Sequence, residues 1–172
     1  MPNLFNIDFL EFLQLLDKHD VDYLLVGGYA VILHGYGRST GDMDLWINQT
    51  VENYNKLQLV YKDFGAPIFS IEDFESDKFD VWSIGVEPRK IEILTKVSGL
   101  NFNEAFKNRL FLNLENFKVP YIDFEDLMKN KMAESLDFIG GSAVFVWLKG
   151  KSTLMIFERH ANLNMETDIS GV

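Results

Sequence analysis

The stretch YLLVGGYAVILHGYGRSTGDMDLWI, residues 23–47, decides what this chain can fold into. Its opening apolar run predicts a strand that is buried on both faces. The run ends at a glycine pair, and residues 28–35 after the pair are expected to form a short helix. A polar turn then leads into a second predicted strand, 42–47. We therefore expect two neighbouring strands joined by a short helix and a turn.

Two aspartates at positions i and i+2 define the second strand. Successive side chains of a strand point to opposite faces, so Asp42 and Asp44 share one face. Met43, Leu45 and Ile47 are then expected to face a core. Two adjacent carboxylates raise each other's pKa unless a cation lies between them. Mg²⁺ is usually held by one or two carboxylates together with substrate phosphates, so the pair predicts a divalent-cation site.

The glycine pair predicts the complement of such a cation site. Backbone N–H groups at the start of a helix attract anions, and glycine allows a phosphate to approach closely. Gly27 and Gly28 are therefore candidate phosphate-binding residues. His34, at the end of the same short helix, is either a ligand or base, or an ordinary structural histidine.

The full motif is Val26-Gly27-Gly28, a gap of thirteen residues, and then the acidic pair in Asp42-Met43-Asp44-Leu45. It resembles the nucleotidyltransferase signature of the DNA polymerase beta superfamily. The longer string is similar to a branch of small prokaryotic nucleotidyltransferases that includes stand-alone minimal proteins and abortive-infection toxin relatives. The resemblance spans about residues 5–133. It implies an α/β (α+β) nucleotidyltransferase fold, with a short mixed, twisted sheet and flanking helices.

A third carboxylate is predicted on a later strand, 90–96. Glu92 lies there between two isoleucines, and an unpaired charge in a buried strand is costly. In the family resembled, a third acidic residue on a later strand completes the metal site, and Glu92 matches it, although the family more often has Asp. The alternative is that Glu92 pairs with Arg89 or Lys90 at the sheet surface.

Two basic residues are further candidates for contact with a nucleotide. The fork of Arg38, in the polar turn, suits bidentate pairing with oxyanions, but Arg38 could equally form a salt bridge to Asp42 or Asp44. The resemblance implies a nucleotide-proximal lysine on the predicted helix near residue 130, where Lys131 matches better than Lys129. The alternative for both lysines is a solvated helix face with a favourable charge near the helix C-terminus.

Composition restricts the classes of protein and of partner. The chain has 172 residues, is 47% hydrophobic and contains no cysteine, which excludes disulfides and thiolate metal sites. It begins with no secretory signal, and no run approaches the roughly 18 apolar residues of a membrane helix, so a cytoplasmic location without membrane contact is expected. A net charge of −10 disfavours tight binding of bare nucleic acid, but does not exclude a tRNA end or a protein as acceptor.

The rest of the chain is expected to supply the other elements and a divergent end. Helices are predicted at 8–19 (capped by Asp8), 51–64 (stopped by Gly65), 102–109 (started by Asn101) and 124–132 (capped by Asp123), and strands at 79–86, 90–96, 111–114 and 117–122. Residues 71–77 are expected to be an exposed acidic segment. We expect a nucleotidyltransferase-like domain at 1–133 and a divergent extension at 134–172, with a hairpin at 142–157 and a frayed tail.

The function predicted from the resemblance is transfer of a nucleoside monophosphate from a nucleoside triphosphate to a hydroxyl on an RNA end, a protein or a small molecule. Mg²⁺ or Mn²⁺ is the expected cofactor, held by Asp42, Asp44 and Glu92. The alternative is a catalytically inactive protein of the same fold that binds an antitoxin or another partner in a toxin–antitoxin or defence system. A glycosyltransferase with a DxD metal motif is disfavoured, because 172 residues are few for a nucleotide-sugar domain.

Overall fold

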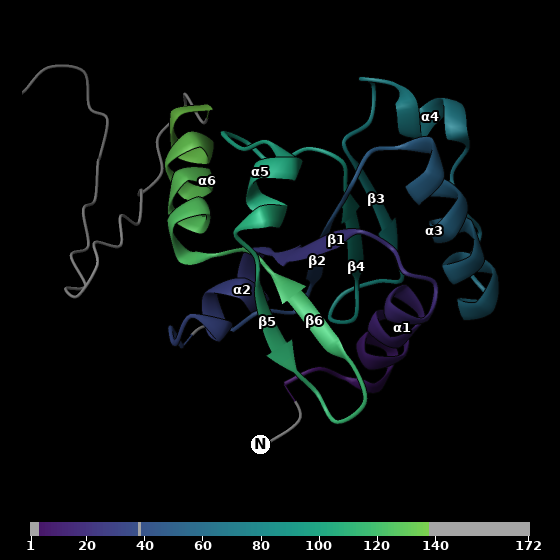
Figure 1. Cartoon of the computed structure of the whole chain (residues 1–172), viewed down its shortest axis with the longest axis horizontal. Helices are drawn as coiled ribbons and strands as arrows, with labels where there is room; N and C mark the ends of the chain where they lie inside the picture. The colour runs from purple at the N-terminus through teal and green to yellow at the C-terminus, as the bar shows by residue number, and fades with distance from the viewer. Residues whose placement is uncertain (1–3, 38, 138–172) are drawn as a thin grey trace, which may run out of the picture.

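A six-stranded sheet forms the centre of the computed structural model, which describes residues 4–37 and 39–137 (Figure 1). Its strand order is β3-β4-β2-β1-β6-β5. The strands are β1 (Tyr23–Val26), β2 (Met43–Ile47), β3 (Val81–Ile84), β4 (Ile91–Leu94), β5 (Leu110–Asn113) and β6 (Lys118–Tyr121).

The sheet is mixed. The pairs β2–β4 and β1–β6 are parallel, whereas β1–β2 and the two edge pairs β3–β4 and β5–β6 are antiparallel. Six helices accompany the sheet in the described part of the chain: α1 (Ile7–Lys18), α2 (Gly27–Leu33), α3 (Val51–Phe64), α4 (Ile71–Glu75), α5 (Phe102–Lys107) and α6 (Phe124–Asp137). The predicted fold class, α/β with a short mixed sheet and flanking helices, is confirmed.

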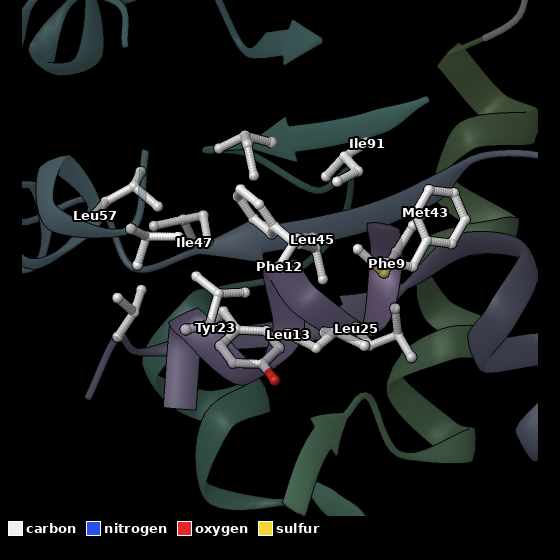
Figure 2. Packing of buried hydrophobic residues seen from close by; sticks show 14 of the residues in the cluster. Phe9, Phe12, Leu13, Tyr23, Leu25, Met43, Leu45, Ile47, Leu57 and Ile91 are labelled. Atoms are coloured by element: carbon white, nitrogen blue, oxygen red, sulfur yellow. The ribbon is translucent and has the colours of Figure 1, made fainter. Parts of the chain in front are cut away.

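The larger core lies on the sheet face that α1, α3 and α4 cover (Figures 1 and 2). Residues of odd number on β2 point into it, as the two-residue period predicted: Met43, Leu45 and Ile47 are fully buried. Figure 2 shows α1 side chains packed over them, including Phe9 and Phe12. The alternation of this one strand therefore sends its even-numbered residues, Asp44 among them, to the other face.

A smaller core lies on that other face. Leu24, Val26 and Trp46 cluster there with one residue each from α2, α5 and α6: Ala30, Ala105 and Leu127. In Figure 1 α5 and α6 lie on the side of the sheet opposite α1 and α3. On this face of β2, Trp46 is buried, whereas Asp44, next to Gly27 at the start of α2, is partly exposed.

Several predicted helix ends are confirmed, and one predicted cap was wrong. Gly65 ends α3 with a φ of 81°, and Asn101 and Asp123 accept hydrogen bonds from the first turns of α5 and α6. The cap of α1 is Asn6 rather than Asp8, because Asn6 is the residue whose side chain accepts from the Phe9 N–H. The acidic residues Glu72, Glu75 and Asp77 are exposed as expected, and residues 71–75 of this segment also form a helix, α4.

The reason for α4 is an aromatic anchor within the acidic run. Phe74 is fully buried and stacks at 5.9 Å from Phe69, between ring centroids. The side chain of Ser70 caps the helix by accepting from the Asp73 N–H. The acidic side chains at 72 and 75 remain exposed around that anchor.

The described chain ends within the last helix. α6 continues past position 133 to Asp137, and the predicted hairpin at 142–157 and the tail lie outside the described residues. The boundary between 133 and 134 therefore stays a prediction. Within residues 4–37 and 39–137, none of the helices has the length and apolar character needed to cross a bilayer.

Candidate active site

The start of β2 and the start of β4 bring the three predicted carboxylates together. Asp44 and Glu92 are register partners on these parallel neighbours, and Asp42 lies two residues before Asp44 on the same face. The side chains of Asp42 and Glu92 are 28% and 24% exposed. Residues 50 positions apart in the sequence therefore form one partly buried acidic cluster.

A lysine lies within this cluster. Lys90 Nζ is 3.0 Å from Asp42 Oδ2 and 2.9 Å from Glu92 Oε1. Lys90 precedes Glu92 by two residues, so the alternation of β4 points both side chains to one face. Of the two partners weighed for Glu92, the structure selects Lys90, because Arg89 pairs instead with Asp8 at 3.5 Å.

Burial and neighbouring charge shift the ionisation of this cluster. The pKa of Asp44 is raised to about 7, first by burial and then by the hydrogen bond and the charge of Glu92. A hydrogen bond from the Gly28 backbone N–H acts in the opposite direction. The pKa of Lys90 is raised by its bonds to Glu92 and then Asp42, so its ammonium is charged at every physiological pH.

One carboxylate oxygen is left without a partner. Asp42 Oδ1 is buried, and among the residues that the structure describes nothing donates a hydrogen bond to it. A buried acceptor without a donor costs about 1–3 kcal/mol, more when it is charged. The oxygen is therefore a candidate ligand atom for a cation.

The donor set fits a hard divalent ion, although the present side-chain arrangement does not yet converge on one. Three carboxylates supply the oxygen ligands that Mg²⁺ and Mn²⁺ prefer. If all three are ionised, the single positive charge of Lys90 leaves a net charge of about −2 for a cation to neutralise. In the described ranges, however, no three acidic or histidine side chains are placed to coordinate a single ion. The Lys90 ammonium instead pairs with two of the acids.

The glycine pair adjoins the carboxylates. A Cβ on Gly27 would overlap the Asp44 Oδ2 atom, and a Cβ on Gly28 would overlap the hydroxyl of Thr40. Gly27 also has a φ of 62°, a conformation that L side chains rarely adopt. Glycine is therefore required at positions 27 and 28 because Asp44 and Thr40 pack closely against them. The expected phosphate contact of this pair remains a prediction.

Arg38 lies outside the described residues. Two other predicted residues, Lys131 and His34, have partners outside the acidic cluster. Lys131 forms an ion pair with Glu134 on α6, at 2.7 Å. His34 bonds through Nε2 to the Ile122 carbonyl oxygen at 2.9 Å, which favours the structural role over that of ligand or base.

A groove of about 610 Å³ lies farther along the same strands. Trp46, two residues after Asp44, and Thr95, three after Glu92, line it together with Phe102. The Thr95 hydroxyl is buried and has no partner among the described residues. None of the three carboxylates lines this groove, so the acidic cluster and the groove are separate features.

From the sequence, Lys90 is predicted only as an alternative partner of Glu92, and Thr40 is predicted either as a turn residue or as a minor site hydroxyl, with the turn role favoured. The two-residue spacing of Lys90 and Glu92 was the available signal for a shared face. The contact between Lys90 and Asp42 depends on the pairing of Met43 with Ile91, which no local pattern specifies. Thr40 lies beside the glycine pair because the turn folds back over Gly28.

Comparison with known proteins gives one structural similarity. No protein-family model matches the chain, and no curated protein sequence matches it. The structure is similar to that of a candidate nucleotidyltransferase from Thermotoga maritima over 75% of this chain and 82% of that one, with 12% identity and a TM-score of 0.49. At this level the similarity assigns no activity to this chain.

Replacing Gly27 tests the packing of the glycine pair against Asp44. We expect Gly27→Ala to lower the free energy of unfolding by at least about 1–3 kcal/mol, because the new Cβ is strained at positive φ and overlaps the carboxylate. Gly37→Ala is the control, since a Cβ there meets no atom within 4 Å, and it should change the free energy by less than about 0.5 kcal/mol. Chemical denaturation measures both. Equal effects of the two substitutions would contradict the packing argument.

The raised pKa of Asp44 predicts a specific pH dependence of stability. A carboxyl that binds its proton more tightly in the folded state stabilises the fold below its unfolded pKa, and this contribution is lost as pH rises toward about 7. With metal ions chelated, the native protein should lose stability between pH 5 and pH 8, whereas Asp44→Asn should not. The free energy of unfolding of Asp44→Asn should therefore rise relative to that of the native protein by more than about 1 kcal/mol over this range. Denaturation curves at several pH values measure the difference.

The control for this experiment is Asp77→Asn. Asp77 is an exposed aspartate whose pKa is lowered by Lys96, so its replacement should give no such gain as pH rises. If the free energies of unfolding of Asp44→Asn and of the native protein differed by a constant amount from pH 5 to pH 8, the raised pKa of Asp44 would be refuted.

Proposed function

We propose that the protein is a Mg²⁺- or Mn²⁺-dependent nucleotidyltransferase, which moves a nucleoside monophosphate from a nucleoside triphosphate to an acceptor hydroxyl. The observation that carries the proposal is the position of Asp44. Its carboxylate packs against Gly27 on one side and is bonded to Glu92 on the other. The glycine pair, expected to face phosphate, and the acids, expected to hold a cation, thus adjoin one another.

Each residue of the cluster would have a defined task in that reaction. Asp42, Asp44 and Glu92 would hold the ion, and the Gly28 N–H orients Asp44 through its hydrogen bond. When bound, the metal would neutralise charge on the leaving pyrophosphate and favour ionisation of the acceptor hydroxyl. Transfer of this kind is mainly positioning and electrostatic stabilisation, so no nucleophilic side chain is needed. Arg38 and Lys131 are the proposed contacts to the nucleotide.

The acceptor is proposed by class. A net charge of −10 opposes long-range attraction of a long polyanion, which disfavours an extended nucleic acid. A tRNA or other RNA end, a protein hydroxyl and a small molecule remain the acceptor classes to test. The proposed site of action is the cytoplasm.

A second candidate function follows from Lys90. Its ammonium already pairs with two of the three acids, as would suit a protein that keeps the fold without turnover and binds a partner, such as an antitoxin. Calorimetry with each nucleoside triphosphate and Mg²⁺ distinguishes the two functions. Measurable nucleotide binding supports the transferase, whereas the absence of binding supports the partner-binding protein.

The direct test of the transferase is a labelling assay. The purified protein is incubated with labelled ATP, CTP, GTP or UTP, Mg²⁺ or Mn²⁺, and RNA, protein or small-molecule acceptors. We expect label transfer that falls at least about 10²-fold in the Asp42→Ala, Asp44→Ala double variant, because the cation loses its ligands.

The control for the labelling assay is the Glu72→Ala, Glu75→Ala double variant. It removes the same two negative charges from exposed positions on α4 and should transfer label at the native rate. Transfer that persists in the aspartate double variant would reject the carboxylate–metal mechanism.

A further inference from the structure

We propose that Lys90 is a tethered counter-ion that a divalent cation must displace, and that Glu87 receives the displaced ammonium. The inference rests on the cation site of the proposed function and adds a residue that regulates access to it. Lys90 Nζ contacts Asp42 and Glu92 closely and lies 3.8 Å from Glu87 Oε1. One flexible side chain thus pairs closely with two acids of the cluster and, at a longer distance, with Glu87 outside it.

The inner position of Lys90 is a partly buried, two-sided ion pair. The Lys90 side chain is 23% exposed and those of Asp42 and Glu92 are 28% and 24% exposed, so solvent screens these contacts less than it screens surface pairs. Charge-assisted bonds at 2.9 and 3.0 Å are short enough to be strong. The ammonium therefore stabilises a cluster that would otherwise consist only of mutually repelling acids.

A divalent ion and the ammonium cannot share these oxygens. An ion bound between Asp42 and Glu92 would lie within a few ångströms of the Lys90 charge, where repulsion between like charges is large in a partly desolvated site. Asp42 Oδ1 is buried and accepts no hydrogen bond from the described residues, so a bound ion would displace no donor from this oxygen. Full coordination by both acids requires Lys90 to leave.

The turn between β3 and β4 offers the outer position. Glu87 precedes Lys90 by three residues and its side chain is 78% exposed, so the ammonium can move toward solvent without any change in the strand. Arg89, between them, is paired with Asp8 rather than with the cluster. A rotamer change of Lys90 then suffices for the exchange.

The consequence is a competition that sets the affinity for the metal. In the cation-free state Lys90 closes the site and offsets part of its negative charge. The observed free energy of binding of a divalent ion is reduced by the cost of displacing the Lys90 ammonium from Asp42 and Glu92. Lys90 therefore lowers the affinity for the metal, although it lies beside the ligands. Glu87 offsets this effect by stabilising the displaced state.

The test is Mn²⁺ binding to the full-length protein without nucleotide, measured by the loss of the free Mn²⁺ electron paramagnetic resonance signal. We expect Lys90→Met to lower the dissociation constant about tenfold. The matched control is Lys96→Met, which removes the same charge from a lysine that bridges Asp77 and Asp80, at 2.8 and 3.1 Å. The control should bind Mn²⁺ as the native protein does.

Glu87→Gln provides a second test at an exposed position, where folding is not at risk. It should weaken Mn²⁺ binding about threefold in the native background, because the displaced lysine loses its partner. In the Lys90→Met background the same substitution should have no effect. An effect of equal size in both backgrounds would mean that Glu87 acts through its own charge, and would overturn the role of Glu87 in the exchange.

The outcomes separate this inference from the proposed function. Native binding that Lys90→Met leaves unchanged or weakens would overturn the counter-ion exchange and leave the metal-dependent transferase intact. Tight binding only in Lys90→Met would support the exchange. Absence of binding in the native protein and in both lysine variants would overturn the exchange and the metal-dependent function together.

Discussion

The pairing of β2 with β4 is the constraint on which the site depends. These parallel neighbours align Asp44 with Glu92, and the two-residue period of each strand adds Asp42 and Lys90 to the same face. Three acids so close together would repel one another strongly if nothing compensated their charge. The structure compensates part of it with the Lys90 ammonium and the Gly28 N–H, while burial and Glu92 raise the pKa of Asp44.

Local pattern was enough to predict the elements and the faces of the central strand. The alternation in 42–47 separated the acids from Met43, Leu45 and Ile47, and the glycine pair correctly marked the start of a short helix. The mixed sheet with flanking helices was predicted through a family resemblance rather than through periodicity. Smaller errors arose where two residues competed for one task, as with Asn6 and Asp8 at the first helix cap.

What the sequence could not predict is non-local. The alignment of Asp44 with Glu92 depends on a crossover through α3 and α4, which is anchored by buried side chains such as Phe74. The choice of Lys90 over Arg89 as partner of Glu92 depends on side-chain reach and on Asp8, which lies far away in sequence. The functions of the carboxylates, the glycines, Arg38 and Lys131 stay predictions, since proximity alone does not establish chemistry.

We propose that the acids of β2 and β4 form a cation site next to the glycine pair. Crystals grown with Mn²⁺ and a non-hydrolysable nucleoside triphosphate test this proposal most directly. We expect an anomalous peak at about 2.0–2.3 Å from oxygens of Asp44 and Glu92, with the Lys90 ammonium turned toward Glu87. A nucleotide bound elsewhere, or Lys90 still seated between Asp42 and Glu92 with no manganese beside them, would contradict it.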